Sequence, residues 1–419
     1  MTRYFLGAAA GAGLTLACAA ALVAQPVIGE ATLDVSRLDG QTVPVVFSLS
    51  RPAADAAPAA TAVWVFAKFQ NAAGGWQDVR WAADGHSIRS EGGATDLIAR
   101  PATGSFFIPG LFLEPADGEA PSGSWTVELL WDFSTSQIDM PEGGYPLLVI
   151  GIDMVLIPEG QFTVGDGRDS EETSTLIGPD DGPLMIDSED EITVGEGEDL
   201  DYAPSDYGGD RAGPIPIAYP KGYGAFYVMR RELTEGQYAA FLSTLSGRGL
   251  ASRDITTNPA YRESGGTIRV GDTITVDQPE RPASFITWAD AIGWTAWAGL
   301  RPMTELEFEK IARGPDAYGV EAILGGRWER VVTLGTPEGR SFTGSHGLGF
   351  VDELAQPFTF LNADWPGPMA LGSGFRGGFG LDTFTTAGNR VYGAYDATYG
   401  GENEGFRAVR TAPEGADQP

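Results

Sequence analysis

Cysteine and histidine are almost absent from this sequence. Its 419 residues include one cysteine, Cys18, and two histidines, His86 and His346. One thiol cannot form a disulfide within the chain, and two isolated histidines cannot make a three-histidine metal site. Disulfide-stapled folds, cysteine-ligated metals and three-histidine iron sites are therefore excluded, and we interpret both histidines as ordinary surface or turn residues.

Basic residues are also scarce. The chain has 27 Lys and Arg against 57 Asp and Glu, for a formal net charge of −30. The basic residues form no clustered stripe, and a polyanion of this size repels phosphate backbones and anionic headgroups. Binding to nucleic acid or to an acidic membrane surface is therefore excluded.

The first 24 residues contain one charge, at Arg3, followed by an uncharged Ala/Gly/Leu-rich run from Tyr4 to Ala24. This pattern is typical of a secretory signal peptide with a small residue at the cleavage site. We expect an exported protein, secreted or held at the cell surface, with the periplasm and the outer surface both open. An uncleaved membrane anchor and lipidation at Cys18 are the alternatives.

Residues 26–147 read as short strands between Gly, Pro and Asp turns. Apolar residues alternate in Val43–Leu49 and Trp125–Phe133, whereas Ala62–Phe69 is apolar at every position but Lys68. Alternation predicts strands with one buried face, and the continuous run predicts a central strand. With no helical pattern in this region, the sequence predicts an all-β sandwich of immunoglobulin or fibronectin type.

An acidic segment follows at residues 166–210, with 16 Asp and Glu against one basic residue, Arg168. We interpret it as a solvated insertion. The alternative is calcium, because carboxylates are hard oxygen ligands, although the spacing of a calcium-binding loop is missing. The candidate calcium ligands here are Asp187, Asp190, Asp199 and Asp201.

Three helices have clear starts. Thr234 with Gln237 and Thr304 with Glu307 have the spacing of capping boxes, and Thr287 is placed to cap a helix over Trp288–Ala298. Gly-rich short strands follow up to Arg410, and residues 412–419 are expected to be a disordered tail. Helices among irregular strands, without βαβ alternation, predict an α+β domain over residues 152–411.

Several segments of this second region carry specific motifs. Residues 153–165, 225–238 and 281–291 are followed by Gly-Leu-Arg-Pro-Met-Thr-Glu-Leu-Glu-Phe-Glu-Lys-Ile-Ala-Arg-Gly at 299–314, then by Arg-Gly-Gly at 376–378 and Gly-Phe-Arg at 405–407. In this order the motifs resemble the formylglycine-generating enzyme (sulfatase-modifying factor) domain, a variant of the C-type-lectin-like fold. We expect the residues of these motifs to cap helices, to fill a hydrophobic core and to supply arginines that bind loops through carboxylates and carbonyls.

The resemblance also implies what this copy lacks. Family enzymes bind copper through two cysteines shortly after the Arg-Gly-Gly motif, whereas here Asp382 and Ala387 stand at those positions. No thiolate is available there for copper, and His86 and His346 cannot supply the histidine ligands that iron-dependent relatives use, so neither copper nor iron is expected as a cofactor. Structural calcium is also a family property, and the resemblance implies Glu329 as a candidate ligand, in a motif that keeps the Trp-Glu pair and lacks the family's asparagine. The alternatives are pairing with Arg327 or Arg330 and a simply solvated carboxylate.

A binding surface is predicted in the last Gly-rich loops, where aromatic and small polar residues alternate. Such loops suit adaptable recognition, and the alternative is that the tyrosines fill an irregular core. The candidate residues are Phe384, Asn389, Tyr392, Tyr395, Asp396, Tyr399 and Asn403.

Three functions are compatible with these residues. The first is a non-catalytic surface or secreted protein that binds a protein or a glycan. The second is a self-assembling subunit of an extracellular matrix, surface layer or filament. The third is an enzyme or maturation factor of the sulfatase-modifying family with different chemistry.

Overall fold

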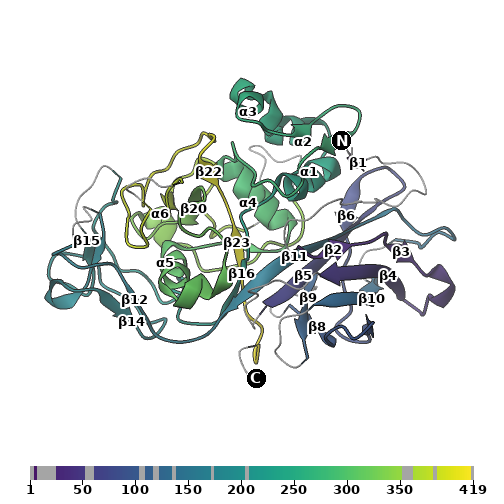
Figure 1. Ribbon diagram of the computed structural model, residues 1–419, viewed down its shortest axis with the longest axis horizontal. Helices are drawn as coiled ribbons and strands as arrows, with labels where there is room; N and C mark the ends of the chain where they lie inside the picture. The colour runs from purple at the N-terminus through teal and green to yellow at the C-terminus, as the bar shows by residue number, and fades with distance from the viewer. Residues whose placement is uncertain are drawn as a thin grey trace.

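The computed structural model describes the backbone of residues 4–6 and residues 25–51, 61–102, 109–116, 122–134, 138–170, 174–202, 207–351, 362–380 and 385–416. The fold is mixed α+β, dominated by strands in antiparallel sheets, with the α-helices in the C-terminal half (Figure 1). In this part of the chain, no helix has the length and apolar character needed to cross a membrane. The predicted leader, residues 1–24, falls outside it apart from the backbone of strand β1 (Tyr4–Leu6).

The first sheet forms the outer layer of the predicted sandwich. Its strand order is β2-β4-β10-β7, with β3 beside β4, and each pair is antiparallel. Alternate residues of β4 and β10 point inward and are buried, as their sequence pattern predicts. The strands are β2 (Val27–Ile28), β3 (Thr32–Leu33), β4 (Thr42–Arg51), β7 (Ser87–Glu91) and β10 (Gly123–Asp132).

The second sheet runs through both halves of the molecule in the order β19-β23-β16-β11-β5-β9-β8, with β6 beside β5. The first part of β11 pairs with β5, and its last part pairs with β16. One long strand therefore joins the sandwich to the second region. The strands are β5 (Thr61–Gln70), β6 (Trp76–Asp78), β8 (Leu97–Pro101), β9 (Gly110–Pro115), β11 (Leu147–Ile157), β16 (Phe226–Met229), β19 (Arg301–Pro302) and β23 (Ala408–Thr411).

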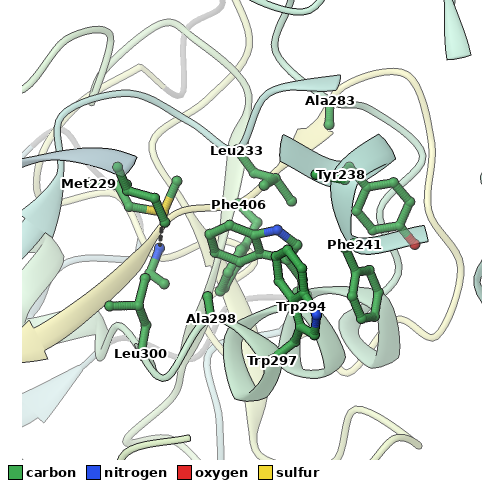
Figure 2. Packing of buried hydrophobic residues seen from close by; sticks show 14 of the residues in the cluster. Met229, Leu233, Tyr238, Phe241, Ala283, Trp294, Trp297, Ala298, Leu300 and Phe406 are labelled. Carbon is green, nitrogen blue, oxygen red and sulfur yellow. Dashed lines mark hydrogen bonds between the residues drawn. The ribbon is translucent and has the colours of Figure 1, made fainter. Parts of the chain in front are cut away.

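Strand β5 is buried on both faces, as its apolar run predicts. Val63 and Val65 face the outer sheet, whereas Trp64 and Phe66 face a second core formed with helices α1 (Glu235–Thr244) and α4 (Trp288–Trp297). The Trp64 indole N–H donates to the Ala298 carbonyl at 2.9 Å. A third, helical layer thus covers the sandwich, and Figure 2 shows this core around Trp294, Trp297 and Phe406.

The helices begin where the sequence predicts. The Thr234–Gln237 and Thr304–Glu307 capping boxes are present, and Thr287 caps α4 in a further box with Asp290. The α-helices are α1 (Glu235–Thr244), α2 (Gly247–Arg253), α3 (Pro259–Glu263), α4 (Trp288–Trp297), α5 (Glu305–Arg313) and α6 (Pro337–Arg340). Short 3₁₀ turns are η1 (Val35–Arg37), η2 (Pro179–Asp181), η3 (Ile255–Thr257) and η4 (Pro315–Gly319).

The acidic segment needs a correction, because only part of it is solvated. Asp187, Asp190 and Asp199 are exposed, but its apolar residues, among them Leu200 and Tyr202, enter a core with α4. The segment is therefore folded onto the second region, at the end of the molecule opposite β4 and β10 (Figure 1). Its strands are β13 (Leu176–Ile177), β14 (Leu184–Ile186) and β15 (Asp201–Tyr202), and β14 pairs with β12 (Phe162–Val164), which precedes the segment.

Two small sheets complete the described strands. One has the order β1-β18-β17, with β17 (Ile268–Arg269) and β18 (Ile274–Val276); the other has the order β21-β20-β22, with β20 (Trp328–Val332), β21 (Ser373–Arg376) and β22 (Glu404–Gly405). The tail differs from expectation over residues 412–416, because the Ala412 N–H donates to the Ala225 carbonyl at 3.1 Å and anchors the chain.

Candidate functional site

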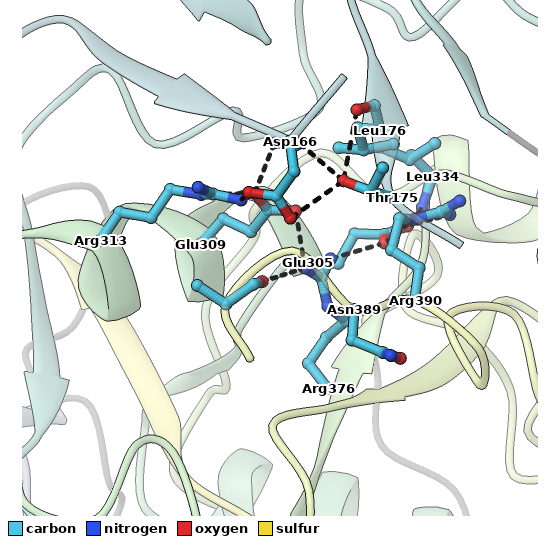
Figure 3. A network of polar contacts seen from close by, with 12 residues as sticks. Asp166, Thr175, Leu176, Glu305, Glu309, Arg313, Leu334, Arg376, Asn389 and Arg390 are labelled. Carbon is cyan, nitrogen blue, oxygen red and sulfur yellow. Dashed lines mark hydrogen bonds and ion pairs between the residues drawn. The ribbon is translucent and has the colours of Figure 1, made fainter. Parts of the chain in front are cut away.

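The family-like motifs of α5 and β21 meet in a buried network of ions, shown in Figure 3. Arg376 reaches Glu305 at 3.1 Å and Glu309 at 2.6 Å, and Arg390 reaches Glu305 at 2.7 Å. The side chains of Arg376, Arg390, Glu305 and Glu309 are 0% exposed. A cluster this deep is stable only when every charge has a partner.

The network extends to the acidic segment through Arg313. Its guanidinium lies 2.9 Å from Glu309 and 3.0 Å from Asp166. Burial acts to raise the pKa of Glu305, but the guanidinium groups of Arg390 and Arg376 prevail and hold this pKa below its ordinary value. Glu305 is therefore ionised at neutral pH, and the contacts of Arg313 fasten the acidic segment to α5.

A second buried pair joins Glu329 of β20 to Arg407. The Arg407 Nε donates to both Glu329 oxygens, at 2.7 and 2.8 Å, and both side chains are 0% exposed. Burial raises the pKa of Glu329 to about 7, although Arg407 opposes this shift. Both oxygens of the predicted calcium ligand are thus held by an arginine, and this arginine is neither Arg327 nor Arg330.

The other predicted calcium ligands do not gather into one shell. Asp201 is buried against Arg211, with Nη2 to its two oxygens at 2.8 and 2.7 Å, whereas Asp199 accepts from the Thr193 N–H at 3.0 Å. Asp187 and Asp190 are exposed. Within the ranges that the structure describes, no three His, Cys, Asp or Glu side chains are placed to hold a metal ion together.

Four tyrosines form a partly exposed aromatic cluster, which we call the tyrosine surface: Tyr207, Tyr392, Tyr395 and Tyr399. The Tyr207 and Tyr395 rings lie 4.1 Å apart at 31°, and Tyr399 meets Tyr395 edge-on at 6.3 Å. Tyr399 is 53% exposed and Tyr207 40% exposed. These rings neither fill the core nor stand alone, so they form a continuous aromatic patch open to solvent.

The tyrosine surface is anchored from below by Arg330. Its guanidinium donates to the carbonyls of Ile286, Ala397 and Tyr399 and lies 4.5 Å from the centre of the Phe375 ring. A planar group with several fixed donors can hold a loop without regular secondary structure. The loop of residues 391–400 is thereby fixed to the core of the second region.

The predicted binding residues divide into three groups. Tyr392, Tyr395 and Tyr399 lie in the tyrosine surface, and Asp396 and Asn403 are exposed nearby in the chain. Asn389 is buried, and its side-chain oxygen accepts from the Val391 N–H at 2.9 Å, so it shapes the loop instead. Phe384 lies outside the described residues.

Two members of the site were missed from the sequence. Tyr207 comes from the acidic segment, and Trp328 of β20 packs edge-on against Tyr392 at 5.1 Å. An isolated tyrosine in an acidic stretch gives no sign of its partner. In the sequence, Trp328 stands out only as part of the shortened Trp-Glu motif.

Comparison with known proteins now decides the family of the second region. Residues 151–329, less than half of the chain, match a family model described as the sulfatase-modifying factor enzyme 1-like domain. Residues 151–329 form a sulfatase-modifying factor enzyme 1-like domain. The resemblance of the motifs at 153–165 and 299–314 is thereby confirmed.

A short segment of the chain is also similar to a named enzyme. It is 41% identical over 56 residues to the formylglycine-generating enzyme of Streptomyces coelicolor, which is 12% of this chain and 18% of that protein. The match thus spans less than a fifth of the length of the Streptomyces coelicolor enzyme. No solved structure matched the chain.

Beyond residues 151–329, one of the two positions where the resemblance implies a family copper cysteine can be located. Ala387 stands there, and its carbonyl accepts from Arg376 Nη2 at 2.6 Å, at the edge of the ion network. A methyl side chain and an occupied carbonyl offer copper no ligand. The second position, Asp382, lies outside the described residues.

Proposed function

We propose that the protein is an exported, non-catalytic binding protein that holds a protein or a glycan on its tyrosine surface at the cell surface. The observation that carries this proposal is the contrast between two parts of one domain. Beside Ala387 the buried charges are paired, whereas at residues 392–399 aromatic rings and polar groups face solvent.

The residue types near Ala387 argue against copper-dependent oxidation. Cys18 is the only cysteine of the chain and lies in the predicted leader. Glu305 and Glu309 are buried and point toward arginines, which hold the pKa of Glu305 below its ordinary value. Neither carboxylate is free to serve as a metal ligand or as a general base toward a bound molecule.

The tyrosine surface has the properties of a recognition site. Tyrosine rings provide a large contact area at a low cost in conformational entropy, and polar neighbours provide adaptable hydrogen bonds. Here the rings contact one another and the loop is anchored by Arg330, so little further ordering is needed on binding.

The experiment is a glycan and protein array probed with the purified protein and with two variants, Tyr395→Ala and Tyr399→Ala. We expect at least one ligand whose signal falls about tenfold or more in both variants, as for aromatic residues at the centre of an interface. Phe350→Ala, which removes an aromatic ring 38% exposed outside the tyrosine surface, serves as the matched control and should bind like the parent.

The outcomes separate the three functions. A ligand retained by both tyrosine variants removes this surface from consideration. Regular polymers seen by electron microscopy, with no ligand on the array, would favour a structural subunit. Oxygen consumption that depends on bound copper or iron would favour an enzyme and contradict the proposal.

A further inference from the structure

We propose that the tyrosine surface selects ligands that carry an ammonium group. This inference rests on the proposed binding function and narrows it to one chemistry. The evidence is a combination of exposed ring faces and nearby carboxylates that make no ion pair among the described residues.

The rings supply the first part of the site. A cation over the face of a tyrosine is attracted by the electron density of the ring, and the attraction grows when water is excluded. Tyr399 and Tyr207 are the most exposed of the four rings, and Tyr395 lies between them in contact with both. The hydrogen bond with Tyr395, together with partial burial, raises the pKa of Tyr399 to about 12, so this ring stays a neutral phenol.

Carboxylates supply the second part. Asp396 follows Tyr395 directly and is exposed, as is Glu402. Glu404 is half-buried, and its Oε2 is a buried atom with no hydrogen-bond partner among the described residues. Its negative charge and the positive charge of Arg330 both act on the Tyr399 phenol, in opposite directions. Carboxylates that make no ion pair among the described residues, next to aromatic rings, favour a positively charged guest.

The neighbouring arginines donate to backbone carbonyls and form no ion pair with these carboxylates. Arg330 directs its donors to the carbonyls of Ile286, Ala397 and Tyr399. Arg327 donates from Nη1 to the carbonyl of Glu402 and not to its carboxylate, and its buried Nε has no hydrogen-bond partner among the described residues. In the described part of the chain, Asp396, Glu402 and Glu404 make no ion pair with a basic side chain.

The charge of the whole chain points the same way. At −30, its field attracts cations and repels phosphate, sulfate and uronate groups. Ammonium groups occur in small quaternary amines and in lysine side chains of a basic protein segment. Both share the chemistry that the site recognises, and the experiment below separates them.

The test is isothermal titration of the intact protein with matched probes. Choline is compared with 3,3-dimethylbutan-1-ol, which has the same shape without the charge, and a lysine-rich peptide is compared with its fully acetylated form. We expect the charged member of at least one pair to bind about tenfold more tightly, because cation–π attraction and the carboxylates act only on charge. Choline binding indicates a small amine, and peptide binding alone indicates a basic partner.

Three variants give the expected pattern. Tyr399→Ala and Asp396→Asn should each weaken the charged probe several-fold and leave the neutral probe unchanged or weaker by less. Phe350→Ala should behave like the parent. Raising the salt concentration should weaken the charged probe, because screening acts on the exposed carboxylates.

Equal affinity for charged and neutral probes, or no binding by any probe, overturns the ammonium inference. If the array then still reports a ligand that depends on Tyr395 and Tyr399, the proposed binding function survives with a different ligand class. If neither experiment reveals a ligand, both proposals fall.

Discussion

The ion network around Glu305 and the tyrosine surface belong to the same part of the fold but are built in opposite ways. The network is buried, charged and internally paired, with Arg376 and Arg390 both reaching Glu305. The tyrosine surface is exposed and aromatic, and Glu404 beside Tyr399 keeps an unpartnered oxygen. Buried charges that pair with one another stabilise the fold, whereas exposed rings and carboxylates that make no ion pair are available to a ligand.

The two regions are nevertheless connected. Arg390 donates to the carbonyl of Gly208 at 3.2 Å, and Tyr207 next to it contributes a ring to the tyrosine surface. The network therefore holds the acidic segment in the place where one of its tyrosines completes the patch. The motif-rich network therefore positions the tyrosine surface without being part of it.

The largest predicted effect comes from breaking the network. Glu305→Ala leaves Arg376 and Arg390 buried with part of their charge unpaired, so we expect a loss of about 3–5 kcal/mol in the free energy of unfolding. Urea denaturation followed by fluorescence measures it. Glu338→Ala, at an exposed carboxylate of α6, is the control. A loss below about 1 kcal/mol for Glu305→Ala would show that the network is not a stabilising element.

A smaller effect is predicted for Glu329 as the pH changes. Its pKa is raised from 4.5 to about 7, so the folded state binds a proton that the unfolded state releases between these values. Its contribution to stability is present below about pH 4.5 and is lost as the pH rises through about 7, by up to about 3 kcal/mol.

Glu329→Gln tests this prediction, because it removes the proton equilibrium and keeps the shape. Denaturation midpoints are measured for parent and variant from pH 4.5 to 8. The midpoint of the parent should fall more steeply with rising pH than that of the variant. Parallel profiles would mean that Glu329 titrates alike in the folded and unfolded states.

The smallest predicted effect on stability is at the tyrosine surface. Tyr399→Ala removes a ring that is 53% exposed, so we expect a change within about 0.5–1 kcal/mol in the free energy of unfolding. Thermal unfolding with circular dichroism measures it. Destabilisation by several kcal/mol would indicate that this tyrosine is part of the core and would remove the contrast with Glu305.

Local features of the fold were predictable from the sequence. The helices that begin after Thr234 and Thr304 were predictable because the side-chain oxygen of each threonine caps a free backbone N–H three residues later. Such capping depends only on neighbouring residues in the sequence. The apolar run of β5 predicted burial on both faces. Helices α1 and α4 cover the second face of β5. This arrangement depends on contacts between distant segments and could not be predicted from the sequence.

The site was predictable only in part for the same reason. Tyr392, Tyr395 and Tyr399 are close in sequence, so a Gly-rich loop carrying them already suggested a surface. Tyr207 contacts them because the acidic segment folds back onto the second region, and no local sequence pattern indicates this long-range contact. The buried position of Asn389 and the partner of Glu329, which is Arg407, likewise follow from packing between distant segments.

The most direct test of the central claim is a titration of the array ligand, or of the charged probe that binds, against the parent and the Tyr395→Ala/Tyr399→Ala double variant. Denaturation midpoints of the two proteins are recorded alongside. We predict that the affinity falls about tenfold or more while the midpoint stays nearly constant. An unchanged affinity in a correctly folded double variant would contradict the assignment of the tyrosine surface as the binding site.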